Sequence, residues 1–222
     1  MPIPQKLLFD LDGTLVDSLT DIATAMNRVL TRHHFPAHPV EAYRTFVGDG
    51  METLVRRVLP ETERENPTRI TTLVQQMKRV YADQWYHASR PYNGIPELLR
   101  GLAARGCPLG VLSNKPEEFT VIMVEHFFPD IPFDVIRGAR PGVPVKPAPE
   151  APLEIAADWQ CPPSEILYIG DTRTDIETGI NAGMPTVGVT WGFRDRTELA
   201  AAGATWIIDH PADLIGIALA EQ

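Results

Sequence analysis

Cysteines, positive charges and long apolar runs are all scarce in this 222-residue chain, and each scarcity excludes a class of protein. The two cysteines, Cys107 and Cys161, are too few for a disulfide framework and lack the spacing of a metal site. A single disulfide between them is the alternative. The 20 basic and 29 acidic residues give a net charge of -9, which argues against a surface that binds nucleic acid or anionic membranes. No apolar stretch approaches the roughly 20 residues that cross a bilayer, and the N-terminus shows no signal-peptide pattern. We therefore expect a cytoplasmic protein without nucleic-acid or membrane partners.

The composition and the order of the segments predict an α/β fold. Hydrophobic residues make up 44% and charged residues 22% of the chain, as in ordinary globular proteins. From about residue 95 onward, helix-like segments alternate with short apolar segments in the rhythm of a parallel sheet. The predicted strands after the first one cover residues 109–112, 133–136, 166–169, 186–189 and 206–208. The predicted helices cover residues 96–105, 117–127, 151–159, 174–182 and 196–202. We expect a Rossmann-like parallel sheet flanked by helices.

Between residues 17 and 89 the alternation stops and the chain reads as almost entirely helical. Helices are predicted at residues 19–33, 51–59 and 68–85. A helical block directly after the first strand would lie above the carboxyl edge of the sheet, where it could act as a lid. We therefore predict a core domain of residues 1–16 and 90–222 and a helical cap domain of residues 17–89. The alternative is a helical subdomain that serves packing alone.

Two aspartates follow the first apolar run, Leu7-Leu8, at the point where the predicted strand leaves the core. Side chains alternate along an extended chain, so Asp10 and Asp12 would point the same way. Gly13 then allows a sharp turn or a close backbone approach. A turn or helix-capping role is the alternative for this pair.

Three further polar clusters follow later strands of the predicted sheet. They are Ser113-Asn114-Lys115, Lys146-Pro147 and Gly170-Asp171-Thr172-Arg173-Thr174-Asp175. The carboxyl ends of parallel strands lie at one edge of a sheet, so these clusters would meet the two aspartates there. The shared location predicts an active site at this edge.

These motifs resemble the four motifs of the haloacid dehalogenase superfamily, and the resemblance covers essentially the whole chain. The matching residues are Asp10-Leu11-Asp12-Gly13-Thr14, Ser113, Lys146 and the segment from Gly170 to Asp175. Within the superfamily, three segments are similar to phosphoglycolate phosphatases and their sugar-phosphatase relatives. These are Phe46-Val47-Gly48-Asp49-Gly50, Arg90-Pro91-Tyr92-Asn93-Gly94 and Ala182-Gly183-Met184-Pro185. The resemblance implies a phosphatase whose helical cap is inserted between the first and second motifs.

Two neighbouring carboxylates suit phosphoryl transfer. A carboxylate is ionised near neutral pH and can attack phosphorus in line, so Asp10 is the expected nucleophile that forms an aspartyl-phosphate. Asp12 would protonate the leaving oxygen and then take a proton from water. For Asp12 the alternative is a carboxylate that stabilises the turn.

The acidic residues and a substrate phosphate need a cation, and Mg²⁺ suits hard oxygen ligands. By resemblance, Mg²⁺ would be held by the Asp10 side chain, the Asp12 backbone carbonyl and Asp171. Asp175 would join the metal shell directly or through water. The alternatives are an acid in the first turn of a helix for Asp175 and an N-cap for Asp171.

Hydrogen-bond donors and a lysine at the same edge of the sheet would bind the phosphate. Lys146 would place a positive charge on the phosphoryl group, and Thr14 and Ser113 would donate hydrogen bonds. Asn114 is a further candidate for phosphate contact, with a turn role as the alternative. For Lys115 a solvated charge is as good an interpretation as phosphate contact, and we do not place it in the site.

The cap would contact the organic part of the substrate. The resemblance assigns that contact to Gly48, Asp49 and Gly50, whereas an ordinary turn between cap helices is the alternative. The arginines that could reach a substrate carboxylate are interpreted as surface charges: Arg56, Arg57 and Arg194.

Together these observations predict a Mg²⁺-dependent phosphatase for a small phosphate ester. The resemblance in the cap and at the hinge implies 2-phosphoglycolate as the leading substrate. A sugar phosphate phosphomutase of the same superfamily shares the aspartyl-phosphate and is the alternative enzyme. A dehalogenase would lack the Asp12 partner. A catalytically silent binding protein is the alternative from another class. The oligomeric state does not follow from the sequence.

Overall fold

Short apolar runs form six parallel strands of one sheet in the computed structural model, which describes residues 6–219. The strands are β1 (Lys6–Phe9), β4 (Leu109–Pro116), β5 (Val135–Ala139), β6 (Ile166–Gly170), β7 (Thr186–Val189) and β8 (Trp206–Ile208). Their order is β5-β4-β1-β6-β7-β8, and every neighbouring pair is parallel. The predicted α/β fold is therefore confirmed.

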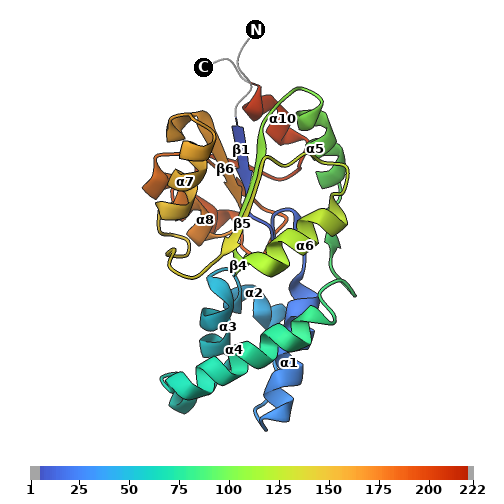
Figure 1. The fold of residues 1–222 in the computed structure, drawn as a ribbon, viewed down its shortest axis with the longest axis vertical. Coiled ribbons are helices and arrows are strands. Elements are labelled where there is room, and N and C mark those ends of the chain that lie inside the picture. The colour runs from blue at the N-terminus through green and yellow to red at the C-terminus, as the bar shows by residue number, and fades with distance from the viewer. Residues whose placement is uncertain (1–5, 220–222) are drawn as a thin grey trace.

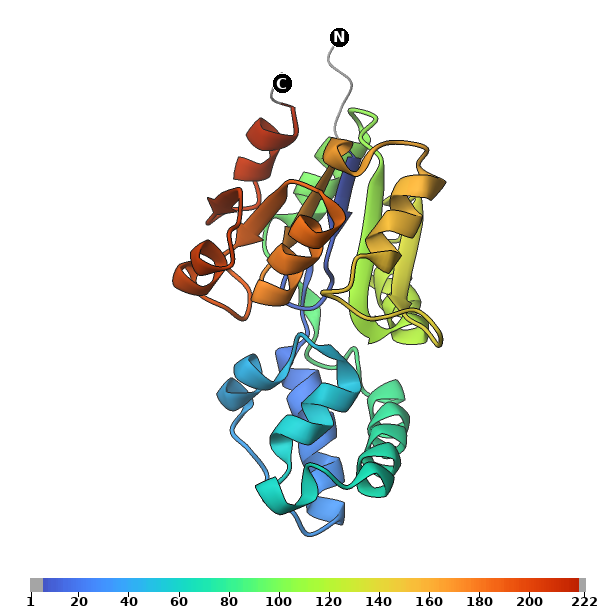
Figure 2. The ribbon, with the colours of Figure 1, turned by 90° about the vertical axis from the view of Figure 1, so that its left-hand side faces the viewer.

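Helices cover both faces of the sheet (Figures 1 and 2). On one face lie α5 (Ile95–Ala103), α6 (Glu117–Phe127) and α10 (Asp213–Ala218), and on the other lie α7 (Glu150–Asp158) and α8 (Arg173–Ala182). The helix α9 (Arg196–Ala201) packs against β7. Because strand side chains alternate, Leu7 and Phe9 join the larger core with α5 and α6, whereas Leu8 joins the core beneath α7 and α8.

Two strand boundaries differ from the sequence prediction. The strand predicted at residues 109–112 continues to Pro116, because it pairs with Ala139 after an irregularity in its register. The strand predicted from residue 133 begins at Val135, because the Asp134 carboxylate accepts the Leu109 N–H and so replaces one bond of the ladder. The short helices α2 (Tyr43–Phe46) and α10 lack enough periodic residues to be predicted.

A helical insert lies at the carboxyl ends of the strands (Figure 1), and we use this name for residues 17–89. It contains α1 (Leu19–Arg32), α2, α3 (Gly50–Val58) and α4 (Pro67–Ala82). The chain leaves the core through β2 (Val16–Asp17) and returns through β3 (Arg90–Pro91), and these two strands pair antiparallel. The three predicted helices of this block are present with slightly different ends, and we keep residues 17 and 89 as the proposed domain boundaries. Within residues 6–219, no helix has the length and apolar character that a bilayer span requires.

The carboxylate of Asp21 holds the two connecting segments together. It is buried at the start of α1 and accepts hydrogen bonds from the Ala88 N–H at 2.9 Å, from the Ser89 N–H at 2.7 Å and from the Ser89 hydroxyl at 2.7 Å. These donors belong to the segment that returns to the core. Asp21 therefore couples the outgoing and returning chains beside the hinge.

We predict that Asp21→Ala lowers the free energy of unfolding by about 1–3 kcal/mol, because it leaves buried donors without an acceptor. The measurement is urea unfolding followed by circular dichroism. Asp83→Ala is the matched control, since Asp83 is exposed at the end of α4, and its effect should stay within about 0.5 kcal/mol. Equal stability of the two variants would contradict the role of Asp21.

Candidate active site

Polar side chains from three segments converge at the carboxyl edge of the sheet, around β1. Asp10 and Asp12 follow β1, Lys146 lies in the loop after β5, and Asp171 follows β6. In this sheet β1 lies between β4 and β6. The connection after β1 leads to β4 on one side, whereas the connection after β6 leads to β7 on the other side, so the two diverge at β1. Open α/β sheets bind ligands at such switch points.

Three carboxylates form a buried acidic cluster. Asp10, Asp171 and Asp175 each place one oxygen within 4.8 Å of the others. The Thr14 hydroxyl donates to Asp171 Oδ1 at 3.0 Å, and the Phe193 N–H donates to its Oδ2 at 2.7 Å. Asp171 is therefore held in place by the segment after β1 and by the loop after β7.

Gly13 makes room for the acidic cluster. Its φ of +91° lies in the left-handed region, and a Cβ at this position would collide with the Asp171 carboxylate. The turn after β1 can therefore approach β6 only with glycine at residue 13. This is the close backbone approach that the sequence predicts for Gly13.

Lys146 lies within the acidic cluster. Its Nζ is 2.8 Å from Asp10 Oδ1 and 2.7 Å from Asp175 Oδ1, and it donates to the Leu112 carbonyl at 3.2 Å. Burial disfavours its charged form, but the carboxylates of Asp10 and Asp175 outweigh burial and raise the pKa of Lys146 well above its usual value. Lys146 is a buried cation here and not a solvated surface charge.

One lysine does not balance three carboxylates. Burial raises the pKa of Asp10 to about 7, against the opposing effect of Lys146. Burial, together with the charges of Asp175 and Asp10, raises the pKa of Asp171 well above its usual value. Asp10 Oδ1 contacts Lys146 but has no well-aligned hydrogen-bond donor within residues 6–219. An excess of buried carboxylate oxygens, one of them unsatisfied, fits a hard divalent cation such as Mg²⁺.

Asp175 takes part in the acidic cluster and also caps a helix. Its Oδ2 accepts hydrogen bonds from the Thr172 N–H at 3.0 Å and the Thr172 hydroxyl at 2.7 Å, so the two residues form a capping box at the start of α8. Its Oδ1 contacts Lys146. Both interpretations of Asp175 are therefore compatible with its position.

Asp12 is paired with a lysine that the sequence analysis left out of the site. Lys115 Nζ lies 2.9 Å from Asp12 Oδ1 and 2.8 Å from Oδ2, and the Ser18 hydroxyl donates to Oδ1 at 2.5 Å. Lys115 is only 8% exposed, so the interpretation as a solvated charge is wrong. Burial opposes its charge, but Asp12 outweighs burial and raises the pKa of Lys115. The sequence analysis ended this strand at residue 112, before the lysine. Because β4 continues to Pro116 and is buried throughout, Lys115 lies inside the protein, where a lysine requires a counter-charge.

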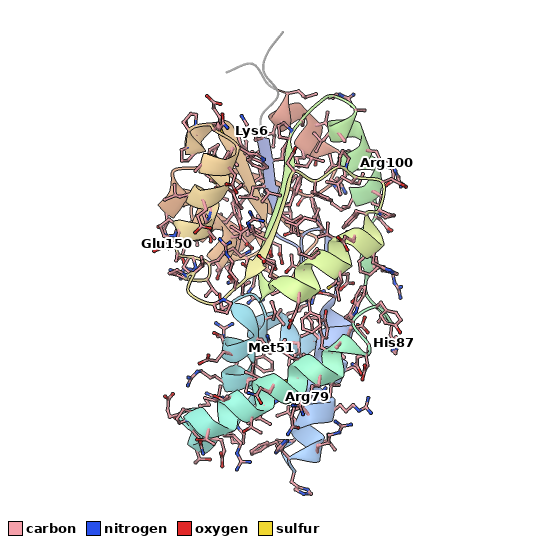
Figure 3. The ribbon with its side chains drawn as sticks, viewed as in Figure 1. Lys6, Met51, Arg79, His87, Arg100 and Glu150 are labelled. Carbon is pink, nitrogen blue, oxygen red and sulfur yellow. The ribbon has the colours of Figure 1, made fainter. Side chains whose placement is uncertain are left out.

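A pocket opens above Asp10 and Asp12, between the sheet edge and the helical insert. It encloses about 540 Å³ of space, part of it continuous with solvent. The insert contributes large apolar side chains, namely Ile22, Val47, Met51, Leu54, Met77 and Tyr81. Met51 is labelled in Figure 3 on α3, at the boundary with the core. The core contributes Asp10, Asp12, Ser113, Asn114, Lys115 and Pro116.

The predicted phosphate donors have partners of their own. The Ser113 hydroxyl lines the pocket and accepts the Lys115 N–H at 3.2 Å. The Asn114 amide donates to the Gly48 and Lys146 carbonyls at 3.1 Å each and accepts the Lys146 N–H at 2.8 Å. The hydroxyl of Thr14 donates to Asp171, and Thr14 is not among the pocket residues. Asn114 and Thr14 thus support other site residues in this arrangement.

The segment from Gly48 to Gly50 lies between the insert and the core. Both glycines line the pocket, but Asp49 points elsewhere: it pairs with Arg57, and its Oδ1 accepts the Thr174 hydroxyl at 2.5 Å. Arg194, interpreted from sequence as a surface charge, has a side chain only 14% exposed and donates to the Val47 carbonyl at 3.1 Å. That interpretation is wrong, because the loop after β7 packs under the insert.

Comparison with known proteins finds similarity along most of the chain. A family model described as haloacid dehalogenase-like hydrolase matches residues 7–189. A phosphoglycolate phosphatase from Mannheimia succiniciproducens is 31% identical over 214 residues, which covers 94% of this chain and 96% of the relative. A phosphoglycolate phosphatase from Haemophilus influenzae is 29% identical over 214 residues, with the same coverage of 94% and 96%.

Solved structures share the whole fold. A candidate phosphoglycolate phosphatase from Lactobacillus delbrueckii is 30% identical, covers 100% of both chains and superposes with a TM-score of 0.92. A protein from Haemophilus somnus described as a predicted phosphoglycolate phosphatase is 29% identical, covers 96% of this chain and 97% of its own, and has a TM-score of 0.87. The similarity therefore includes the helical insert as well as the sheet.

We predict that Mg²⁺ stabilises this protein through the acidic cluster, and more strongly at high pH. The folded pKa of Asp10, about 7, exceeds its ordinary 3.8, so the folded state binds more protons between these values. The unfolding free energy of the metal-free protein therefore has a component that falls as pH rises through this window. Saturating Mg²⁺ should raise the Tm by about 5 °C or more at pH 8, and by less at pH 5.

The measurement is thermal unfolding with Mg²⁺ or with a chelator. In Asp171→Asn the metal-free protein should be more stable than wild type at pH 8, and its Mg²⁺ shift should be lost. Asp130→Asn, at an exposed position outside the site, is the control and should behave as wild type. An undiminished Mg²⁺ shift in Asp171→Asn would rule out this cluster as the metal site.

Proposed function

Since the chain belongs to the haloacid dehalogenase-like hydrolases, we propose that it is a Mg²⁺-dependent phosphatase that hydrolyses a small phosphomonoester through an aspartyl-phosphate. The observation that carries this proposal is the buried pairing of Asp10 with Lys146, next to Asp171, at the floor of a pocket that Asp12 also lines. Carboxylate nucleophile, proton carrier and positive charge are thereby within reach of one phosphate ester.

In the first half of the reaction, a carboxylate oxygen of Asp10 attacks phosphorus in line with the ester bond. A bond forms between this oxygen and phosphorus, and the bond from phosphorus to the leaving oxygen breaks. Asp12, which lines the same pocket, donates the proton that the leaving alkoxide needs. The products of this half-reaction are the free alcohol and phosphorylated Asp10.

In the second half, water attacks the phosphorus atom of the aspartyl-phosphate, and Asp12 takes the proton of that water. The bond between phosphorus and the Asp10 oxygen then breaks, which releases inorganic phosphate and restores the carboxylate. One proton leaves Asp12 and one returns to it, so the cycle closes without another reactant.

Positive charge around the phosphoryl group comes from two sources. Lys146, 2.8 Å from Asp10, would offset the charge of the equatorial oxygens. The residues that would hold Mg²⁺ are Asp10, Asp171 and the backbone carbonyl of Asp12, with Asp175 joining directly or through water. When bound, Mg²⁺ would supply the further positive charge that lets an anionic carboxylate approach an anionic phosphate.

The pocket favours a small substrate. The apolar side chains of the insert line the space above Asp10 and limit its size. We propose 2-phosphoglycolate as the leading substrate, on the strength of the similarity to phosphoglycolate phosphatases along the whole chain. A phosphomutase would transfer the same phosphoryl group to a second sugar hydroxyl, and product analysis distinguishes it.

We predict that wild-type protein releases phosphate from 2-phosphoglycolate only with Mg²⁺, and that Asp10→Asn lowers kcat by about 10³-fold or more, because the amide is a poor nucleophile. The assay is phosphate release from 2-phosphoglycolate, hexose phosphates and nucleoside monophosphates. Asp130→Asn is the control and should keep the wild-type rate. Wild-type rates in Asp10→Asn, in protein free of contaminating phosphatase, would remove the proposed mechanism.

We predict that Asp12→Asn slows alkyl phosphates more than aryl phosphates. An alkoxide must be protonated as it leaves, whereas a nitrophenolate leaves readily as an anion. General acid catalysis contributes about 10²–10⁴-fold, so the loss in the first half-reaction should approach that range for 2-phosphoglycolate and be much smaller for 4-nitrophenyl phosphate.

The measurement is the pre-steady-state burst of alcohol or nitrophenol, which reports the first half-reaction alone. Equal losses of the burst rate for both substrates would contradict the acid role of Asp12. A slow second half-reaction of Asp12→Asn with both substrates would agree with the role of Asp12 as the base.

A further inference from the structure

The pocket has a single cationic wall residue. Among the described residues that line it, only Lys115 carries a positive side chain. Lys146 lies beneath, between Asp10 and Asp175, and does not line the pocket. Lys115 Nζ sits 4.7 Å from the centre of the Tyr81 ring, which belongs to helix α4 of the insert. The ammonium thus lies in the pocket where the core meets the insert.

The wall that the insert gives to the pocket is mostly apolar. Met51, Leu54, Met77 and Tyr81 belong to it, and Tyr81 lies against Lys115. A carboxylate that enters such a space without a cationic partner loses hydration and gains nothing in return. A neutral substituent of the same size has no such requirement. The pocket would therefore bind a leaving group with a carboxylate only where a cation is available, whereas a neutral leaving group needs no cation.

The arginines near the insert have other partners. Arg44 and Arg194 donate to backbone carbonyls across the boundary between insert and core. Arg56 and Arg57 pair with acidic residues of the insert, Glu52 and Asp49. None of these four lines the pocket in the part of the chain that the structure describes. Recognition of a carboxylate therefore falls to Lys115.

Lys115 is able to make such a contact. An ammonium group has three donors, and the two contacts to Asp12 leave at least one of them for another acceptor. The flexible stem of a lysine lets the charge shift by a short distance without moving the backbone. The contact with Asp12 also keeps Lys115 next to the proton carrier of the proposed reaction, close to where the leaving group must lie.

We propose that Lys115 determines specificity by binding a carboxylate on the leaving group, so that the enzyme selects phosphate esters of small hydroxy acids over neutral phosphate esters. The inference rests on the proposed phosphatase function and adds the residue that recognises the substrate. Three observations carry it together. The Lys115 ammonium is buried, the wall beside it is apolar, and the nearby arginines have other partners.

The test compares two substrates that differ in one charge: 2-phosphoglycolate and 2-phosphoglycolamide, in which an amide of nearly equal volume replaces the carboxylate. A hydrogen bond to a charged group corresponds to about tenfold or more in kcat/KM, so wild-type protein should prefer the carboxylate by at least that ratio. In Lys115→Met the ratio should fall by about tenfold or more. Lys115→Arg, which keeps the charge, should restore part of the preference.

Lys78→Gln is the matched control. Lys78 lies on α4 next to Met77, and its Nζ pairs with Glu118 at the surface, so the change removes one positive charge without altering the pocket. The ratio in this variant should equal that of wild type. Should Lys115→Met not fold, the preference of wild-type protein and the partial preference of Lys115→Arg still test the inference.

Three results would overturn the inference. The first is a wild-type protein without preference for the carboxylate. The second is an equal loss on both substrates in Lys115→Met, which would place Lys115 on the phosphate or on Asp12 alone. The third is turnover of other phosphate esters but of neither test substrate, which would leave the proposed phosphatase standing. A wild-type protein that hydrolyses no phosphate ester with Mg²⁺ would remove the proposed function and this inference together.

Discussion

The burial of three carboxylates around one ammonium is the constraint on which the rest of this structure depends. Lys146 pairs with Asp10 and Asp175, and Asp171 lies within the same cluster. Burial raises the pKa values of Asp10 and Asp171, and the neighbouring carboxylates raise them further. Such an arrangement is unfavourable for folding by itself. A divalent cation would offset this charge, so the acidic cluster has the chemistry of a metal-binding site.

Neighbouring elements hold the acidic cluster in position. The parallel pairing of β1 with β6 brings Asp10 and Asp171 together, and Gly13 removes the Cβ that would separate them. Hydrogen bonds from Thr14 and Phe193 orient Asp171, and the capping box of α8 orients Asp175. These supports come from several loops on one sheet, and together they fix the positions of the carboxylates.

The helical insert forms the other wall of the pocket. Its apolar side chains line the space above Asp10, while Asn114 and the contact between Asp49 and Thr174 connect it to the core. Lys115 lies between the two parts, paired with Asp12 and next to Tyr81. The same residue therefore contacts both the edge of the sheet and the wall of the insert, so the proposed substrate recognition and the proposed proton transfer would share one small volume.

The sequence by itself determined the α/β fold, the helical insert and the positions of Asp10, Asp12, Lys146 and Asp171, because apolar periodicity and the residues that follow each strand are local features. The tertiary structure decided which partner each side chain has. Lys115 pairs with Asp12 because β4, the parallel neighbour of β1, continues past Leu112 to Pro116. Thr14 turns to Asp171, and Arg194 reaches the insert, because separate loops pack together at one edge. Such pairings depend on register and docking between segments far apart in the chain, and no local pattern encodes them.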